Sequence, residues 1–249
     1  MKAIILAAGE GKRLRPFTLE RPKCMVEIGG KSLLERQLHI LDHKEISDVI
    51  IIGGYKIEML KGKANKVIEN PRYQDTNMVS TLFCAEEELK GDLIISYGDI
   101  VYSRGILEKL IYSDADISVV IDKDWESYWR KRNEDPLDDA ETLKIGKDGN
   151  IIEIGQKPSS LDEVEGQYIG LMKFKSKGIS QIKSTFYSIK ENEGLLNKSL
   201  DEAYMTDLLQ TAIDLGNPVT PVFINGDWVE VDTVKDMTSD VTLNRLNSI

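Results

Sequence analysis

The strongest constraint on the fold is a repeated alternation of short apolar runs with amphipathic segments through residue 121. The apolar runs are rich in Ile, Val and Leu, as in strands buried on both faces of a sheet, and the segments between them place apolar residues at helical spacing. Strands joined by helices run parallel, so the pattern predicts an α/β fold with a mostly parallel sheet flanked by helices. We expect strands at residues 2–6, 49–53, 67–69, 93–96 and 117–121, and helices at residues 32–43, 58–66, 79–89 and 105–111.

The pattern changes after Asp122. Strands expected at residues 142–145, 151–154 and 168–174 look antiparallel, because Asp148-Gly149-Asn150 forms a tight turn between the first two. Two helices, a strand pair around residues 219–224 and 228–231, and a terminal helix complete the chain. With 249 residues and no visible repeat or linker, we expect one domain over residues 1–249, in which residues 122–175 form an elaboration over the sheet.

Composition excludes several classes of partner. The formal net charge of −10 argues against a nucleic-acid-binding surface, which is normally basic. No apolar run approaches the ~18 residues that cross a membrane, and the N-terminus carries no secretory pattern. The two cysteines, Cys24 and Cys84, are too few for a disulfide framework. These features predict a cytoplasmic protein with no membrane and no nucleic-acid partner.

The first expected strand runs directly into a small-residue, cationic loop. Residues 6–14 are Leu-Ala-Ala-Gly-Glu-Gly-Lys-Arg-Leu, and residues 1–25 hold six Lys or Arg against two Glu. Backbone N–H groups and cations gathered at the end of a strand are typical of a phosphate-binding loop. Two known motifs fail here: Leu14 replaces the third glycine of G-x-G-x-x-G, and Met25 replaces the first glycine of a P-loop ending at Lys31-Ser32. We therefore predict a nucleoside triphosphate site built on a different loop.

That loop, followed by Pro22-Lys23, resembles the nucleotidyltransferases that join a nucleoside triphosphate to a phosphorylated small molecule. This superfamily includes sugar-1-phosphate nucleotidylyltransferases and phosphocholine-type cytidylyltransferases. The resemblance implies a Rossmann-like sheet with a small antiparallel elaboration, of the nucleotide-diphospho-sugar transferase type. It also implies catalytic roles for Arg13 and Lys23, with Lys12 and Arg13 on the β- and γ-phosphates and Lys23 on the α-phosphate. The implied nucleotide-binding residues of the loop are Leu6, Ala7, Ala8, Gly9, Glu10, Gly11, Lys12, Arg13 and Lys23.

Carboxylates at two distant points of the chain match the metal-binding positions of this superfamily. Gly98 and Asp99 follow an expected central strand, at the sheet edge where open α/β folds bind ligands. Glu230 and Asp232 lie two residues apart, hence on one face of a strand. The resemblance implies that Asp99 and Asp232 hold Mg²⁺ on the nucleotide phosphates, with Glu230 as an additional or alternative ligand. Carboxylate oxygens suit Mg²⁺, and Gly98 and Asp99 are expected to contact the nucleotide.

Thr76-Asn77, with Ser80, resembles the base-binding segment of the phosphocholine and phosphonate cytidylyltransferases. Amide and hydroxyl side chains can pair with a pyrimidine edge, so the resemblance favours CTP and assigns Thr76, Asn77 and Ser80 to the nucleotide site. Asn77 is also suited to cap the helix that follows, and the two roles are compatible.

Residues 124–171 are expected to select the acceptor. Arg130 and Arg132 can grip a phosphate or phosphonate bidentately. Trp125, through a cation–π contact, or the carboxylates of residues 134–141 can hold an amine. Lys157 resembles a lysine before proline that contacts the acceptor in the superfamily, which implies a catalytic role, and Tyr168 is expected to line the same cavity. A charge run of this kind is also typical of a solvated face.

Taken together, these residues predict a Mg²⁺-dependent cytidylyltransferase. It would transfer CMP from CTP to a small phosphorylated or phosphonate acceptor, such as 2-aminoethylphosphonate, phosphoglutamine or phosphocholine, and release pyrophosphate. The resemblance places the reaction in cell-surface polysaccharide or phosphonate decoration, and a homodimer would be usual for such folds. Two alternatives stay open: a sugar-1-phosphate nucleotidylyltransferase that uses UTP or dTTP, and a catalytically inactive relative that senses nucleotides.

Overall fold

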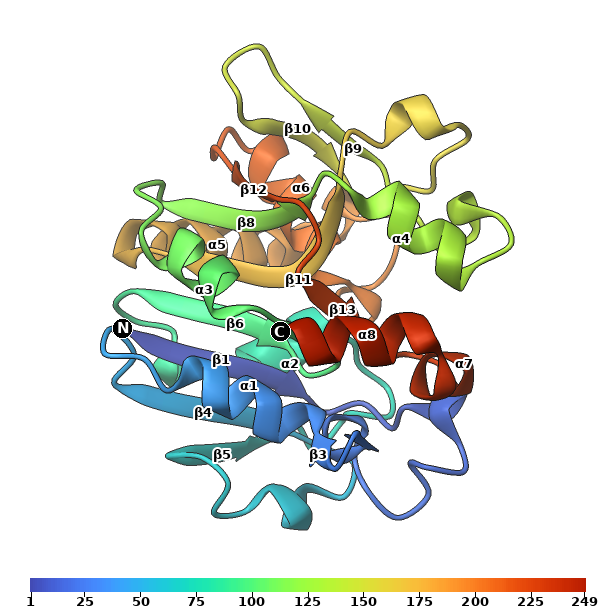
Figure 1. Ribbon diagram of the computed structural model, residues 1–249. Helices are drawn as coiled ribbons and strands as arrows, with labels where there is room; N and C mark the ends of the chain where they lie inside the picture. Colours follow the sequence, from blue (N-terminus) through green and yellow to red (C-terminus); the bar gives the residue numbers. More distant parts are fainter.

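A seven-stranded sheet runs through the centre of the molecule (Figure 1). The computed structural model describes the backbone of residues 1–249 and every side chain except that of Glu193. From edge to edge the strands are β12 (Thr220–Ile224), β8 (Ile117–Asp122), β11 (Gln167–Phe174), β6 (Leu93–Tyr97), β1 (Lys2–Ala7), β4 (Asp48–Gly53) and β5 (Lys66–Glu69). Neighbours are parallel except β11, which is antiparallel to β6 and β8. The expected mostly parallel sheet is therefore confirmed.

The inner strands are apolar on both faces because helices cover both sides of the sheet. Ile4 and Ile5 of β1 are both fully buried, although neighbouring side chains of a strand point to opposite faces. Leu93, Ile94 and Ile95 of β6 are equally buried. This two-sided burial explains the continuous runs of Ile, Val and Leu that identify the strands in the sequence.

Helices pack on each face of the sheet (Figure 1). One face carries α1 (Leu33–Leu41), α3 (Arg104–Ile111) and α8 (Asp240–Ser248), and the other carries α2 (Met78–Phe83), α5 (Ser176–Glu191) and α6 (Met205–Asp214). Helix α1 begins as expected at Ser32, whose Oγ accepts from Glu35 N at 3.1 Å while the Glu35 carboxylate accepts from Ser32 N at 2.8 Å. Among the described residues, no helix is both long and apolar enough to cross a membrane.

Short strands pair outside the main sheet. They are β2 (Glu27–Ile28) with β3 (Lys31–Ser32), β7 (Ile100–Tyr102) with β13 (Trp228–Glu230), and β9 (Leu143–Ile145) with β10 (Ile151–Ile154). The antiparallel pair β9–β10 is joined through Gly149, whose φ of 82° fits the expected tight turn. Helices α4 (Trp125–Arg132) and α7 (Val234–Thr238) lie beyond the carboxyl ends of the parallel strands, on the right in Figure 1.

Several expectations about local structure are wrong. Residues 58–66 form no α-helix: a 3₁₀ segment, Ile57–Leu60, ends before Gly62, whose φ of 77° is left-handed. Helix α2 stops at Phe83 rather than continuing to residue 89. Strand β11 lies inside the central sheet and not in an elaboration beside it. Strands β12 and β13 do not pair with each other, because β12 pairs with β8 and β13 with β7.

Candidate active site

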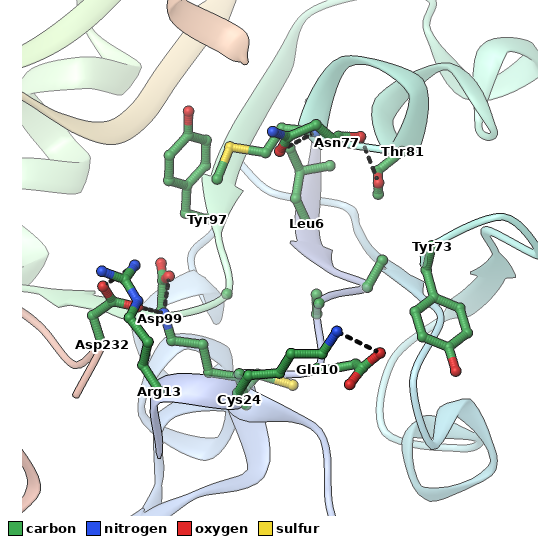
Figure 2. A pocket seen from close by; sticks show the side chains of 18 of the residues that line it. Leu6, Glu10, Arg13, Cys24, Tyr73, Asn77, Thr81, Tyr97, Asp99 and Asp232 are labelled. Carbon is green, nitrogen blue, oxygen red and sulfur yellow. Dashed lines mark hydrogen bonds and ion pairs between the residues drawn. The ribbon is translucent and has the colours of Figure 1, made fainter. Parts of the chain in front are cut away.

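A cavity of about 720 Å³ opens at the carboxyl ends of β1 and β6 (Figure 2). Open α/β sheets bind their ligands at this edge, and the volume is within the range of small-molecule sites. The cavity is lined by Leu6, Ala7, Ala8, Gly9, Glu10, Gly11, Lys12, Arg13, Lys23, Cys24, Tyr73, Gln74, Thr76, Asn77, Met78, Thr81, Tyr97, Gly98, Asp99, Tyr204, Glu230 and Asp232. Every residue that the sequence assigned to the loop after the first strand is therefore present.

Tight backbone contacts fix the loop that follows β1. Gly11 has a φ of 61°, and a Cβ at this position would lie 3.0 Å from Lys23 Cβ and 3.1 Å from Thr18 Cγ2. Thr18 Oγ1 donates to Gly11 O at 2.8 Å. Gly98 N donates to Leu6 O at 2.9 Å, so the loop after β6 is bound directly to the end of β1. A glycine is required at residue 11 both for its conformation and for close packing against Lys23.

Lys23 lies between two carboxylates at one end of the cavity. Its Nζ donates to Asp99 Oδ2 at 2.5 Å and to Asp232 Oδ1 at 2.7 Å, and Arg13 pairs with the other oxygen of Asp232. Burial alone would lower the pKa of Lys23, but attraction to Asp99 and Asp232 outweighs it and holds this pKa above its ordinary value of 10.5. The ammonium therefore stays charged. Figure 2 shows Arg13, Asp99 and Asp232 gathered on one side of the cavity.

Pairing between β7 and β13 brings these carboxylates together. The antiparallel register aligns Glu230 with Ile100, and beyond the last pair Val231 N donates to Asp99 O at 3.0 Å. Asp99 comes just before β7, and Asp232 comes just after β13. The sequence identified both carboxylates, but the strand pair that joins them was not expected.

The carboxylate pair fits a hard divalent cation. Asp99 Oδ1 is buried and has no hydrogen-bond partner among the described residues. Its second oxygen and Asp232 already share one cation, the Lys23 ammonium. Among the described side chains, no group of three or more Asp, Glu, His or Cys is placed to hold a metal. Two carboxylates suit Mg²⁺, which keeps water and substrate phosphate oxygens as its other ligands.

The residues predicted to contact the base separate into two groups. Thr76 and Asn77 line the cavity, whereas Ser80 does not; its Oγ donates to Asp201 Oδ1 at 3.3 Å. Asn77 caps α2, since its Oδ1 accepts from Met78 N at 2.9 Å, and its Nδ2 donates to Glu202 O at 3.3 Å. The capping role of Asn77 is thus observed, and the cavity-facing role of Ser80 is not.

The five residues predicted to contact the acceptor do not line the cavity. Trp125 is buried against Trp129 and cannot present its ring to a ligand in this conformation. Arg132 is also buried, and its Nη1 donates to Glu230 Oε2 at 2.7 Å. The structure therefore does not place Arg132 against an acceptor, as the sequence predicted; its partner is a carboxylate that lines the cavity. Arg130 is exposed and pairs with Glu126 on its own helix.

Lys157 and Tyr168 do not line the cavity. Lys157 Nζ donates to the backbone carbonyls of Leu137 at 2.5 Å and Asp138 at 2.7 Å. Tyr168 is buried and packs edge-on against Tyr97, with ring centroids 5.9 Å apart. Tyr97 is the member of this pair that lines the cavity.

An acidic group adjoins Tyr97 and Tyr168. Glu141 is half-buried, and its carboxylate makes no hydrogen bond to another described residue. Burial, followed by repulsion from Asp207 and Asp139, raises the pKa of Glu141 to about 7. A half-buried carboxylate beside aromatic rings is a suitable receptor for an organic cation.

Sequence reasoning missed several residues that line the cavity. Tyr73, Gln74, Met78, Thr81 and Tyr204 come from three segments whose closeness depends on the fold. Gly54 lets Tyr73 approach the backbone closely, because a Cβ at residue 54 would lie 2.5 Å from Tyr73 Cβ. The two consecutive glycines at the end of β4, Gly53 and Gly54, were the sequence signal for this close approach.

A family model and curated relatives match the chain. The model of the MobA-like NTP transferase domain matches residues 3–145, which include the loop after β1, Lys23 and Asp99. A CTP:phosphoglutamine cytidylyltransferase of Campylobacter jejuni is 43% identical, over 95% of this chain and 98% of the relative. A choline-phosphate cytidylyltransferase of Streptococcus pneumoniae is 41% identical over a shorter stretch, 42% of this chain and 47% of the relative.

Solved structures share the fold. An inositol-1-phosphate CTP transferase from T. maritima superimposes with a TM-score of 0.74 at 22% identity, over 98% of this chain and 94% of the other. A CTP:phosphocholine cytidylyltransferase from Streptococcus pneumoniae superimposes with a TM-score of 0.69 at 23% identity, over 99% and 97%. At these identities the likeness establishes the architecture alone.

Proposed function

Because the chain belongs to the MobA-like NTP transferase family and has the nucleotide-diphospho-sugar transferase fold, we propose that it is a Mg²⁺-dependent cytidylyltransferase. It transfers CMP from CTP to a small acceptor that carries a phosphoryl or phosphonate group and an amine, and releases pyrophosphate. The observation that carries the proposal is the convergence of Arg13, Lys23, Asp99 and Asp232 at one end of a nucleotide-sized cavity. The relative that is 43% identical over nearly the whole chain supports CTP as the donor.

Charge neutralisation and positioning supply the catalysis. The attacking acceptor oxygen is already anionic at neutral pH, so it needs no general base; it forms a bond to the α-phosphorus as the bond to pyrophosphate breaks. Lys23 contacts the α-phosphate, and Lys12 with Arg13 contacts the β- and γ-phosphates. Asp99 and Asp232 hold Mg²⁺, which neutralises phosphate charge when bound.

The acceptor occupies the part of the cavity bounded by Tyr97 and Glu230. The cations Arg13 and Lys23 lie beside Asp232, whereas Glu141, with Asp207 and Asp139 as acidic neighbours, lies beside the cavity-lining Tyr97. An acceptor with a phosphoryl group at one end and an ammonium group at the other matches this charge distribution. Glutamine phosphate, 2-aminoethylphosphonate and phosphocholine have both groups, and glucose 1-phosphate lacks the cation. A role in cell-surface decoration and a homodimeric state stay predictions.

A pyrophosphate-release assay over CTP, UTP, dTTP, ATP and GTP, each with these four acceptors, tests the proposal. We expect turnover with CTP and an acceptor that carries an amine or quaternary ammonium, and none for the Asp99→Asn variant under the same conditions. Turnover confined to UTP or dTTP with glucose 1-phosphate would identify a sugar-1-phosphate nucleotidylyltransferase. No turnover with any pair at millimolar Mg²⁺ would favour the nucleotide-sensing relative.

A further inference from the structure

Arg132 ends helix α4 with a guanidinium group that is buried and fully engaged. The residue is 8% exposed, and its Cζ lies 5.3 Å from the ring centroids of Tyr128 and Trp129. Its Nε and Nη2 donate to the two carboxylate oxygens of Asp236 at 3.1 and 3.3 Å, while Nη1 donates to Glu230 at 2.7 Å. A planar guanidinium group that is paired with two carboxylates and packed against two aromatic rings is fixed in a single orientation.

Asp236 links the Arg132 guanidinium to the backbone of Asp232. Asp236 Oδ2 accepts from Asp232 N at 3.1 Å, from Thr233 N at 2.8 Å and from Thr233 Oγ1 at 2.9 Å, and the residue is 4% exposed. Lys235 Nζ also donates to Arg132 O at 2.5 Å. Helix α4 therefore holds the turn that begins α7, and this turn bears Asp232.

Resting on the proposed function, we propose that Arg132 and Asp236 form a positioning pair that fixes Asp232 for the divalent cation. Asp232 lies two residues beyond the end of β13 at Glu230, so strand pairing alone does not set the direction of its carboxylate. The bonds to its N–H and to that of the next residue set the backbone at this position. Carboxylates that hold metal ligands in place in this way contribute to metal affinity although they never contact the metal.

Arg132 also determines the charge beside Asp232. It pairs with Glu230 and Asp236, which are otherwise two neighbouring carboxylates in a largely buried place. Without the guanidinium, their mutual repulsion and desolvation would shift the turn that bears Asp232. If Arg132 and Asp236 only stabilised the fold, replacing them would lower stability alone. If they position Asp232, replacing them must also lower metal affinity and kcat in protein that is still folded.

The test uses Arg132→Met, Arg132→Lys and Asp236→Asn, with Lys131→Met as the matched control. Lys131 is the preceding cation on the same helix and is exposed. For each protein we would measure the melting temperature, the affinity for Mn²⁺ in the presence of α,β-methylene-CTP by electron paramagnetic resonance, and kcat and KM in the pyrophosphate-release assay. The spectroscopic signal reports the metal without turnover.

We expect Arg132→Met and Asp236→Asn to weaken Mn²⁺ binding and to lower kcat by about 10–100-fold, the usual effect of removing a group that orients a metal ligand. KM for CTP should change less than about threefold, Arg132→Lys should fall between wild type and Arg132→Met, and Lys131→Met should match wild type. If Arg132→Met does not fold, Arg132→Lys and Asp236→Asn decide the question. Folded variants with wild-type Mn²⁺ affinity and kcat would overturn the positioning role. A wild-type protein that binds no Mn²⁺ with the nucleotide would overturn the proposed function as well.

Discussion

Replacing Glu141 with Gln should stabilise the protein at neutral and alkaline pH. The carboxylate is half-buried, and no described residue compensates it with a hydrogen bond. Burial and the nearby Asp207 and Asp139 raise its pKa from the ordinary value of 4.5 to about 7. The ionised form is therefore disfavoured in the folded state and readily accepted in the unfolded chain. Glutamine has nearly the same shape and no charge to lose.

The magnitude follows from proton linkage. The folded state binds the proton of Glu141 more tightly, so the free energy of unfolding falls as pH rises from about 4.5 to about 7 and stays lower above that. A shift from 4.5 to about 7 is roughly 2.5 units, and one unit corresponds to about 1.4 kcal/mol, which gives about 3 kcal/mol. Glu141→Gln should therefore exceed wild type by up to about 3 kcal/mol near pH 8, and the difference should vanish below pH 4.5.

Urea denaturation from about pH 4 to pH 8 measures this difference. Glu58→Gln is the control, because Glu58 is an exposed carboxylate that does not line the cavity and should leave the pH dependence unchanged. The reasoning is refuted if Glu141→Gln is no more stable than wild type near pH 8, or if the difference between the two proteins is the same at both ends of the range. The same variant should raise KM for an aminated acceptor and leave KM for CTP unchanged. This is the result expected if the Glu141 charge lowers stability but contributes to binding the acceptor.

Four further perturbations test other parts of the structure. Lys23→Ala should lower kcat by roughly 10²–10³-fold with little change in KM for CTP, and an unchanged rate would contradict its assignment to the α-phosphate. Gly98→Ala places a Cβ 2.8 Å from a backbone oxygen of β1 and should destabilise by about 1–3 kcal/mol in thermal or urea unfolding. Gly105→Ala, in the open side of α3, should stabilise by about 0.5–1 kcal/mol. A thiol reagent should label the exposed Cys84 quickly and the buried Cys24 only on unfolding, because burial raises the pKa of Cys24 to about 12; rapid modification of both would contradict this.

The phosphate end of the site could be predicted because its residues are close in the sequence. Residues 6–13 form one loop after a buried strand, and Lys23 follows within the same segment. Local chemistry, small residues for backbone approach and cations for phosphate, is visible without any knowledge of tertiary contacts. The two carboxylates were found by their positions after apolar strands, although the pairing of β7 with β13 that joins them was not expected.

The acceptor end could not be predicted in the same way, because its residues are shared between packing and binding. A cluster of tryptophans and arginines has the same composition in a ligand pocket and in a folded core. In the structure Trp125 packs in the core and Arg132 is buried with two carboxylates. Buried Asp122 explains why β12 and β13 do not pair with each other, as the sequence had suggested. It accepts from Gly226 N at 2.9 Å and from Trp228 Nε1 at 2.7 Å, which directs the chain away from β12 and into β13.

The pairing of Lys23 with Asp99 and Asp232 has a consequence for how ligands enter the site. The cations assigned to phosphate and the carboxylates assigned to metal neutralise each other in the free protein. A triphosphate that bound alone would draw Lys23 and Arg13 away and leave two half-buried carboxylates unpaired. A divalent cation that bound alone would lie against the Lys23 ammonium and be repelled by it. Both penalties disappear when the two arrive together, because the triphosphate accepts the cations while the carboxylates accept the metal. We therefore expect the protein to bind the metal–nucleotide complex far more tightly than either component.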